Sequence, residues 1–260
     1  MKITTWNVNS LKVRLPHVLD WLAANPVNAL GIQETKSQDE HFPIEAFETA
    51  GWQVAFHGQK TYNGVALVAQ SPIEDVEKNI PGLDDPQARM IAGTVEGVRV
   101  INCYCPNGAS LESDKYPYKL GWFEALHGFV QDELTRHDKL VVIGDFNIAP
   151  LPEDTWDPEE WEGKILCSPP ERAALQKLLD LGLTDCWTQC VQRDGPREDK
   201  ARFTWWDYRA AGFRRNLGLR IDHVLATKTL SETCSSCAVD LEPRRLERPS
   251  DHAPVTAVFD

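Results

Sequence analysis

The sequence predicts one α/β domain in which two β-sheets pack against each other. Short apolar runs typical of strands recur along the whole chain, while only three segments show the apolar spacing of helices. A doubly wound sheet would place a helix after nearly every strand, so this ratio favours two packed sheets. No repeat, low-complexity tract or linker divides the chain, and 42% hydrophobic residues suffice for a large core. We therefore expect residues 1–260 to form a single domain.

The N-terminal part predicts a strand, a helix and a second strand. Residues 2–8 read as the first strand, and 27–33 form a second apolar run that ends at Glu34. Between them, apolar residues recur at helical spacing, namely Leu11, Leu15, Val18, Leu19 and Leu22. Asn9 and Ser10 precede this pattern and are good N-cap candidates.

The middle of the chain predicts mainly strands. Four runs are expected to be extended, at 52–56, 64–70, 89–95 and 98–105. Gly97 provides a tight turn between the last two. Residues 115–137 have a helical pattern, and 139–146 form an apolar strand that ends near Asp145.

The last third begins with a long acidic loop at 148–168, rich in Pro and Trp. Loops of that length usually carry function. Pro169 and Pro170 then start a helix that runs to about Leu181, with Gly182 as its C-cap. Strands are expected near 219–226, 236–241 and 253–259.

The net charge of −12 is unusual for a protein that binds nucleic acid. The charge is uneven, however, because residues 145–162 contain only acidic charges, whereas basic residues gather further along at Arg209, Arg214 and Arg215. One basic face suffices for binding DNA. No stretch approaches the roughly 20 apolar residues of a membrane span. The first strand starts directly after Met1, which predicts no signal peptide and a cytoplasmic protein.

Seven cysteines is an odd number, which argues against a disulfide framework. Cys234 and Cys237 form a CxxC pair, and Cys186 and Cys190 are four residues apart. A zinc site would need two such pairs brought together. We expect most of these residues to be buried thiols, and the role of the CxxC stays open.

Polar residues stand at the ends of the predicted apolar strands. Asp145 and Asn147 lie two residues apart, so their side chains would project to the same side of an extended chain. Each such residue alone has an ordinary explanation, such as a turn, a surface acid or a core histidine. All of them together favour one functional site, built from Asn7, Glu34, Tyr104, Asp145, Asn147, Asp222, Asp251 and His252.

These residues carry a resemblance that spans residues 6 to 254. The chain resembles the exonuclease III branch of the endonuclease/exonuclease/phosphatase superfamily. The matching runs are Trp6–Asn9, Gln33–Lys36, Tyr104–Gly108, Gly144–Pro150, Trp205–Arg209, Gly218–His223 and Ser250–Pro254. The resemblance implies a four-layer α/β-sandwich with two central, mostly antiparallel sheets flanked by helices. It also implies a hydrolase of DNA repair, acting as a 3′-to-5′ exonuclease, an endonuclease 5′ to abasic sites, or both.

The resemblance assigns roles to the strand-end residues. Glu34 would hold Mg²⁺ or Mn²⁺, with Asn7 and Asp251 completing the shell and Asp145, Asn147 and His252 close by. Oxygen ligands make zinc a poor fit. Tyr104, Asp145, Asn147, Asp222 and His252 would be catalytic, with Asp222 orienting His252. Whether Asp145 or His252 is the general base stays open.

The resemblance also predicts contacts with double-stranded DNA by a monomer. Trp205 or Trp206 would line a sugar pocket with Leu219, and the other tryptophan is expected in the core. Asn107, Arg209, Arg214 and Arg215 would contact phosphates.

Two departures bear on activity. Asn9 stands where some relatives carry Asp, which makes a second metal less favourable. The loop 148–168 is of the Asn-Ile-Ala-Pro type, unlike the loop ending N-x-A-H of other members. If Leu166 lies near the pocket, its bulk would hinder a flipped abasic sugar and favour 3′-end processing.

Two rival interpretations keep the superfamily but change the substrate or the activity. Some superfamily members cleave phosphoinositides, sphingomyelin or poly(A), although the Trp205–Arg209 and Arg220–His223 runs argue against those substrates. Other related chains have lost their active residues and only bind partners. Because Glu34, Asp145 and His252 are all present here, we expect an enzyme.

Overall fold

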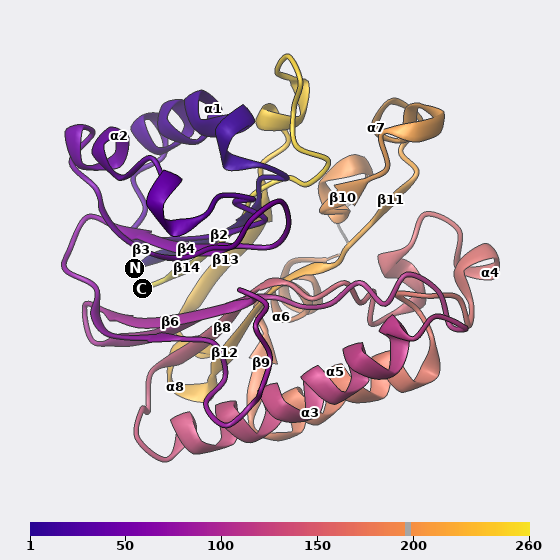
Figure 1. The fold of residues 1–260 in the computed structure, drawn as a ribbon. Helices are drawn as coiled ribbons and strands as arrows, with labels where there is room; N and C mark the ends of the chain where they lie inside the picture. The colour runs from indigo at the N-terminus through magenta and orange to yellow at the C-terminus, as the bar shows by residue number, and fades with distance from the viewer. Residues whose placement is uncertain (196–198) are drawn as a thin grey trace.

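The computed structural model describes residues 1–195 and 199–260 and contains two six-stranded sheets stacked face to face (Figure 1). The first sheet has the order β13-β14-β1-β2-β4-β3, and the second has the order β5-β6-β7-β8-β12-β9. In each sheet one strand pair is parallel, β1 with β2 and β7 with β8, and the other four pairs are antiparallel. The expectation of two mostly antiparallel sheets is therefore confirmed.

The strands have the following bounds. The first sheet contains β1 (Lys2–Asn7), β2 (Ala29–Gln33), β3 (Gln53–His57), β4 (Val65–Ala69), β13 (Cys234–Val239) and β14 (Val255–Phe259). The second contains β5 (Glu74–Lys78), β6 (Met90–Val95), β7 (Val98–Tyr104), β8 (Leu140–Asp145), β9 (Leu183–Asp185) and β12 (Asp222–Thr227). A separate ribbon pairs β10 (Trp205–Trp206) with β11 (Gly218–Leu219).

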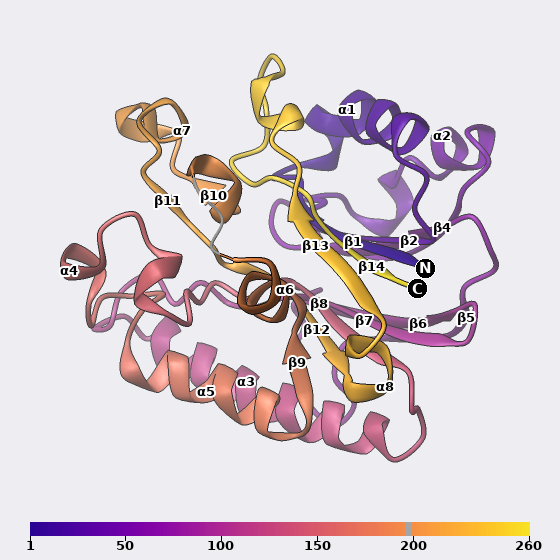
Figure 2. The same ribbon diagram turned by 180° about the vertical axis from the view of Figure 1, so that it is seen from behind.

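Helices cover both outer faces, which completes four layers (Figures 1 and 2). The first sheet is covered by α1 (Leu11–Ala24) and α2 (Ile44–Thr49), and the second by α3 (Lys115–Leu134) and α5 (Pro169–Asp180). The remaining helices are α4 (Pro158–Trp161), α6 (Cys186–Asp194), α7 (Gly212–Arg215) and α8 (Lys228–Ser231). The four-layer sandwich implied by the sequence is confirmed.

The core is built from three apolar layers. The central one lies between the sheets and joins Ile3 and Leu67 of the first sheet to Val100 and Ile143 of the second. Aromatic and aliphatic side chains of α1 and α2 pack on the outer face of the first sheet, and those of α3 and α5 on the second. Burial of these faces is the main driving force that holds the layers together.

Several elements differ from the prediction. The expected strand at 219–226 is broken, because Arg220 turns inward to ion-pair with Asp154 and Asp185, and β12 begins only at Asp222. Ser10 precedes α1, but its side chain makes no cap hydrogen bond. Gly182 follows the C-cap residue Leu181 and has a φ of 97°.

The prediction also omitted five helices, α2, α4, α6, α7 and α8, and three strands, β5, β9 and β10. Among the residues that the structure describes, no helix combines the length and hydrophobicity required to cross a bilayer.

Candidate active site

Residues at the ends of neighbouring strands converge where the two sheets meet. In the second sheet Tyr104 pairs with Asp145 across β7 and β8, and Asp145 pairs with Asp222 across β8 and β12. Asn7, which ends β1 in the first sheet, faces Asp145. The Asn7 amide nitrogen donates to Asp145 Oδ2 at 2.9 Å and to Glu34 Oε1 at 2.9 Å. One buried carboxamide thus joins both sheets at the site.

The backbone around Asp145 has an unusual shape that the sequence provides for. Gly144 has a φ of 145°, and a Cβ there would lie 1.9 Å from the carbonyl oxygen of Cys103, so only glycine fits. Asn147 has a φ of 51°, a left-handed conformation that asparagine tolerates well. Its backbone N–H donates to Asp145 Oδ1 at 2.9 Å. This turn places both side chains in the site.

His252 lies against two carboxylates. Its Nδ1 is 2.9 Å from Asp222 Oδ2, and its Nε2 is 3.7 Å from Asp145 Oδ2. Burial opposes the charge of the imidazole, but Asp222 and Asp145 outweigh that effect and raise the pKa of His252 to about 10. His252 is therefore a buried imidazolium at neutral pH.

Asp145 has the opposite character. Burial disfavours its charge and raises its pKa to about 7, partly offset by His252 and reinforced by Asp222 and Glu34. A carboxylate that titrates near neutral pH is suited to accept a proton. The pKa values of the two groups therefore differ, with His252 favouring its charged form at pH 7 and Asp145 titrating near that pH.

Tyr104 and Asn107 lie beside this pair. Burial, with the carboxylates of Glu34 and Asp145, raises the pKa of Tyr104 well above its usual value, so the phenol keeps its proton. The Asn107 amide nitrogen donates to Asn147 Oδ1 at 2.8 Å. Asn147 in turn donates to the carbonyl oxygen of Cys105 at 3.0 Å. The amide side chains are thus fixed by the loops that carry them.

The sequence analysis missed Lys119, a fully buried lysine of α3. Its ammonium donates to the carbonyl oxygens of Asn147 at 2.7 Å and Asn107 at 3.1 Å, and it pairs with buried Glu171. It therefore fixes the two backbone segments that present the site amides. A charged residue within the apolar face of a predicted helix was the available signal.

The Asp251 carboxylate is hydrogen-bonded to neighbouring side chains. Its two oxygens accept hydrogen bonds from the Asn9 amide at 2.8 Å and the Trp205 indole at 3.0 Å. Asn9 also accepts a hydrogen bond from Lys36, whose ammonium lies 2.8 Å from Glu34 Oε2. The chain Asp251–Asn9–Lys36–Glu34 thus forms one rim of the site.

The residues predicted to contact DNA divide into two groups. Trp206 and Leu219 are both fully buried, so they do not present a surface to DNA. Trp206 packs edge-on against Phe213 and belongs to the core, as expected for one of the two tryptophans. Trp205 is partly exposed next to Asp251.

The three predicted arginines are exposed on the segment between β10 and β11. The Arg209 side chain is 90% exposed and ion-pairs with its neighbour Asp207 at 2.9 Å. Arg214 and Arg215 lie on α7, which is at the upper right of Figure 1. Lys12, Lys36 and Lys60 line a further pocket with His41, which the sequence analysis did not single out.

Leu166 closes the long acidic loop, which contains α4 and a short 3₁₀ turn. Its φ is 72°, which is rare for a leucine, and its side chain is buried in a cluster with Leu219 and the partly exposed Trp205. Strained residues of this kind concentrate at functional sites. Leu166 therefore packs into the same cluster as the predicted sugar-pocket residues.

The site residues fit a divalent cation that prefers oxygen. Burial is the main cause of the raised pKa of Asp145, and the carboxylates of Asp222 and Glu34 add to it while His252 opposes it. Asp145, Asp222 and His252 also offer ligand atoms that all lie within 4.8 Å of one another. Carboxylate and amide oxygens suit Mg²⁺ or Mn²⁺. Glu34 has a left-handed φ of 52°, a strained conformation typical of functional positions.

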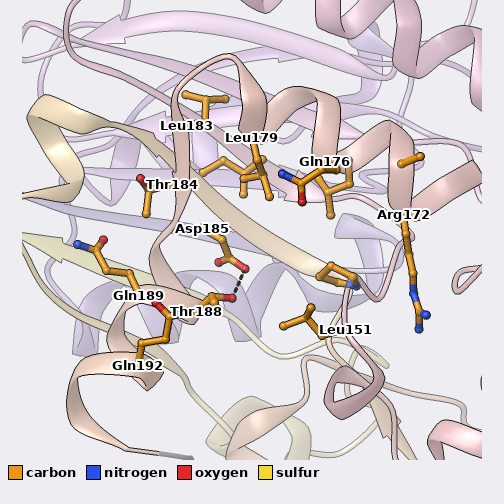
Figure 3. Close-up of a pocket in the computed structure, with 14 residues that line it drawn as sticks. Leu151, Arg172, Gln176, Leu179, Leu183, Thr184, Asp185, Thr188, Gln189 and Gln192 are labelled. Atoms are coloured by element: carbon orange, nitrogen blue, oxygen red, sulfur yellow. Dashed lines mark hydrogen bonds between the residues drawn. The ribbon is translucent and has the colours of Figure 1, made fainter. Parts of the chain in front are cut away.

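A separate pocket of about 630 Å³ lies between α5 and α6 (Figure 3). Leu151, Leu179 and Leu183 provide its apolar wall. Its acidic residue Asp185 is already bonded to Thr188 at 2.7 Å and to Arg220. The pocket contains none of the strand-end residues, so it is not the candidate active site.

Two facing mixed sheets, with carboxylates, amides and an imidazolium at their shared edge, define a sandwich-type phosphoesterase. The chain belongs to the Endonuclease/Exonuclease/phosphatase family, which matches residues 4–252. It is 36% identical to Exodeoxyribonuclease III of Haemophilus influenzae, with all of both chains covered.

Solved structures agree with this family. A 3′-5′ exonuclease, NExo, from Neisseria meningitidis is 56% identical, has a TM-score of 0.96 and covers all of both chains. A second structure describes the 3′ phosphatase NExo from Neisseria bound to a product DNA hairpin. An AP endonuclease from Archaeoglobus fulgidus is 38% identical with a TM-score of 0.93, covering 100% of this chain and 99% of that one.

Proposed function

We propose that this chain is a DNA-repair phosphodiesterase that acts mainly on 3′ ends, as a 3′-to-5′ exonuclease and 3′-phosphatase. The observation that carries this proposal is the pairing of a neutral-pH base, Asp145, with an imidazolium, His252, within one buried site. The relatives named as an exodeoxyribonuclease III, a 3′-5′ exonuclease and a 3′ phosphatase support the substrate class. We propose a monomeric, single-domain enzyme of the cytoplasm.

Asp145 is the general base in this mechanism, and His252 is not. Because His252 already carries its proton at neutral pH, it has no lone pair with which to activate water. Asp145 accepts the proton of the attacking water as the phosphorus–oxygen bond to the 3′ oxygen breaks. His252 Nε2 and the Asn147 amide then donate to the phosphate oxygens, which gain charge in the transition state.

Asp222 and Tyr104 complete the set of proposed catalytic residues. Asp222 holds His252 through Nδ1 at 2.9 Å, so the ring presents Nε2 to the substrate. Tyr104, whose pKa is raised, remains a hydrogen-bond donor to the scissile phosphate. When bound, Mg²⁺ or Mn²⁺ supplies Lewis-acid stabilisation of the phosphate and leaving oxygens. Glu34 would hold it, with Asn7 and Asp251 shaping the shell.

DNA is held by exposed cations on the segment between β10 and β11. Arg209, Arg214 and Arg215 would contact the duplex backbone, with Asn107 at the phosphate and Trp205 against the terminal sugar. Phosphate contacts of this kind bind any sequence and weaken with salt. They let a protein of net charge −12 bind DNA through one local surface.

Leu166 sets the preference for 3′ ends. Its buried side chain packs with Leu219 and the partly exposed Trp205, which supports this proposal. A flipped abasic sugar would compete with Leu166 for a pocket lined by these residues. An enzyme with this pocket filled would cleave at ends and exclude an internal abasic nucleotide.

The experiment compares three duplexes, with a recessed 3′ hydroxyl, a 3′ phosphate and an internal abasic analogue, each with Mg²⁺ and then with excess EDTA. We expect EDTA-sensitive cleavage of the first two only. Leu166→Gly should gain abasic incision while keeping exonuclease rate. Leu151→Gly is the matched control, since Leu151 lies in the same loop but lines the other pocket. Strong abasic incision by the parent chain would refute the 3′-end preference, and cleavage of none would refute the DNA substrate.

A further inference from the structure

Four of the seven cysteines gather on two facing elements away from the active site. Cys186 and Cys190 lie one turn apart on α6, and therefore on the same face of that helix. Cys234 and Cys237 lie on β13. All four are buried in the central core, and α6 packs directly on β13. The CxxC pair, whose role the sequence left open, thus belongs to a thiol cluster.

Three of the thiols approach one another within this cluster. The Cys234 thiol lies within hydrogen-bonding reach of the Cys186 and Cys190 thiols. Across residues 1–195 and 199–260, the one group of three or more ligand atoms close enough to share a metal is Asp145, Asp222 and His252. The geometry of the thiols therefore favours chemistry between two sulfurs and not a metal centre.

The electrostatics distinguish the two partners. The hydrogen bond from Cys186, against the effect of burial and with help from Cys190 and Arg193, lowers the pKa of Cys234 to about 7. The same hydrogen bond, together with burial, raises the pKa of Cys186 well above its usual value. The lowered pKa of Cys234 and the raised pKa of Cys186 favour Cys234 as the attacking sulfur and Cys186 as the resolving one.

The cluster lies close to the surface. β13 is the edge strand of its sheet, with a register shift between Cys234 and Ser236. Arg193 on α6 covers it, donating to the carbonyl oxygen of Cys234 at 2.8 Å and lying 3.7 Å from Cys190 Sγ, while its own side chain is 44% exposed. An edge strand opens locally more readily than a central one, so a small oxidant has a route to the sulfur.

We propose that Cys234 and Cys186 form a peroxide-driven, reversible disulfide. The Cys234 thiolate attacks one oxygen of hydrogen peroxide, the O–O bond breaks, and with one proton taken up a sulfenic acid and water result. The Cys186 sulfur then attacks the sulfenic sulfur, forming the S–S bond and releasing a second water. Two thiols lose two electrons, and one peroxide is reduced to two waters.

The disulfide would tie together the two sheets. α6 follows β9, the edge strand of the second sheet, and β13 is an edge strand of the first. A disulfide between Cys186 and Cys234 would therefore link the two sheets covalently at one side. It would also close a loop in the unfolded chain. Such a loop closure corresponds to a rise in Tm of about 5–10 °C for a chain of this size.

The test exposes the reduced full-length chain to a small excess of hydrogen peroxide at pH 7.5, then quenches it and counts free thiols after denaturation. We expect the seven thiols to fall to five, with a Cys186–Cys234 linked peptide in the digest, a higher Tm, and full reversal by dithiothreitol. Titrating inorganic zinc as a separate probe should give no stoichiometric binding.

Variants keep the test decisive. Cys234→Ala and Cys186→Ala should each abolish the linked peptide and the Tm shift. Cys103→Ala is the matched control, because Cys103 is buried in another core layer and its raised pKa keeps it protonated. Seven free thiols after oxidation, a linkage that excludes Cys234, or tight zinc binding would overturn the proposal. Because the peptide analysis uses the parent chain, it stands even if a variant fails to fold.

Discussion

The pairing of Asp222 with His252 makes a prediction that pH can test. In Asp222→Asn the carboxylate 2.9 Å from Nδ1 is lost, whereas the more distant Asp145, at 3.7 Å from Nε2, remains. The ring stays buried, so desolvation then opposes its charge. We expect the pKa of His252 to fall back toward its ordinary value of 6.5.

The size of the effect follows from the same numbers. The difference between a pKa of about 10 and the ordinary 6.5 corresponds to about 5 kcal/mol in favour of the imidazolium. Asp222 is the closest carboxylate and the largest of the effects that favour the imidazolium. At pH 7.5 the variant therefore loses most of its cation, and we expect kcat to fall about 10²- to 10³-fold, as for the loss of one transition-state donor.

The assay is single-turnover 3′-end cleavage of a recessed duplex between pH 6 and 10.5. In the parent the rate should rise as Asp145 deprotonates near pH 7 and fall only near pH 10 as His252 loses its proton. In Asp222→Asn the decrease in cleavage rate at alkaline pH should shift to near-neutral pH. Asp240→Asn, which alters a carboxylate bound to Trp21 outside the site, should keep the parent profile. If the cleavage rate of Asp222→Asn still decreased only near pH 10, Asp222 would not be what raises the pKa of His252.

Three further predictions concern stability and binding. Lys119→Met leaves Glu171 buried without its cation and should cost about 3–5 kcal/mol in urea unfolding, largely recovered by adding Glu171→Gln. Asp145→Asn should raise Tm at pH 8 but not at pH 4, because a carboxyl whose folded pKa is about 7 stabilises the fold while protonated and loses that contribution as pH rises. An unchanged Tm at pH 8 would contradict this. Replacing Arg209, Arg214 and Arg215 by Ala should reduce the salt slope of duplex affinity by up to about 2.7, measured by fluorescence anisotropy with uncleaved DNA in EDTA.

Much of the site was predictable because it follows apolar strands. Glu34, Asp145 and His252 stand where hydrophobic runs stop or begin, and strand ends at a shared edge bring such residues together. Lys119 was not predictable in this way. Its partners are backbone carbonyl oxygens of two distant loops, which no local pattern records.

The missed elements have physical reasons as well. α6 begins with Cys, Trp and Thr, which are weak helix formers, and it forms because its apolar face packs on β13. β5 is an exposed edge strand with mostly charged residues, so it lacks apolar alternation. Trp205 and Trp206 are adjacent, and only the direction of β10 decides which one is buried.

The position of Asn7 between the two sheets has a consequence for how activity is acquired. Glu34 follows β2 and His252 precedes β14 of the first sheet, whereas Asp145 and Asp222 lie in the second, so neither sheet alone holds a complete site. During refolding, catalytic competence would therefore appear only after the halves have docked, later than secondary structure. The rate at which nuclease activity recovers would thus report the docking of the two sheets during refolding.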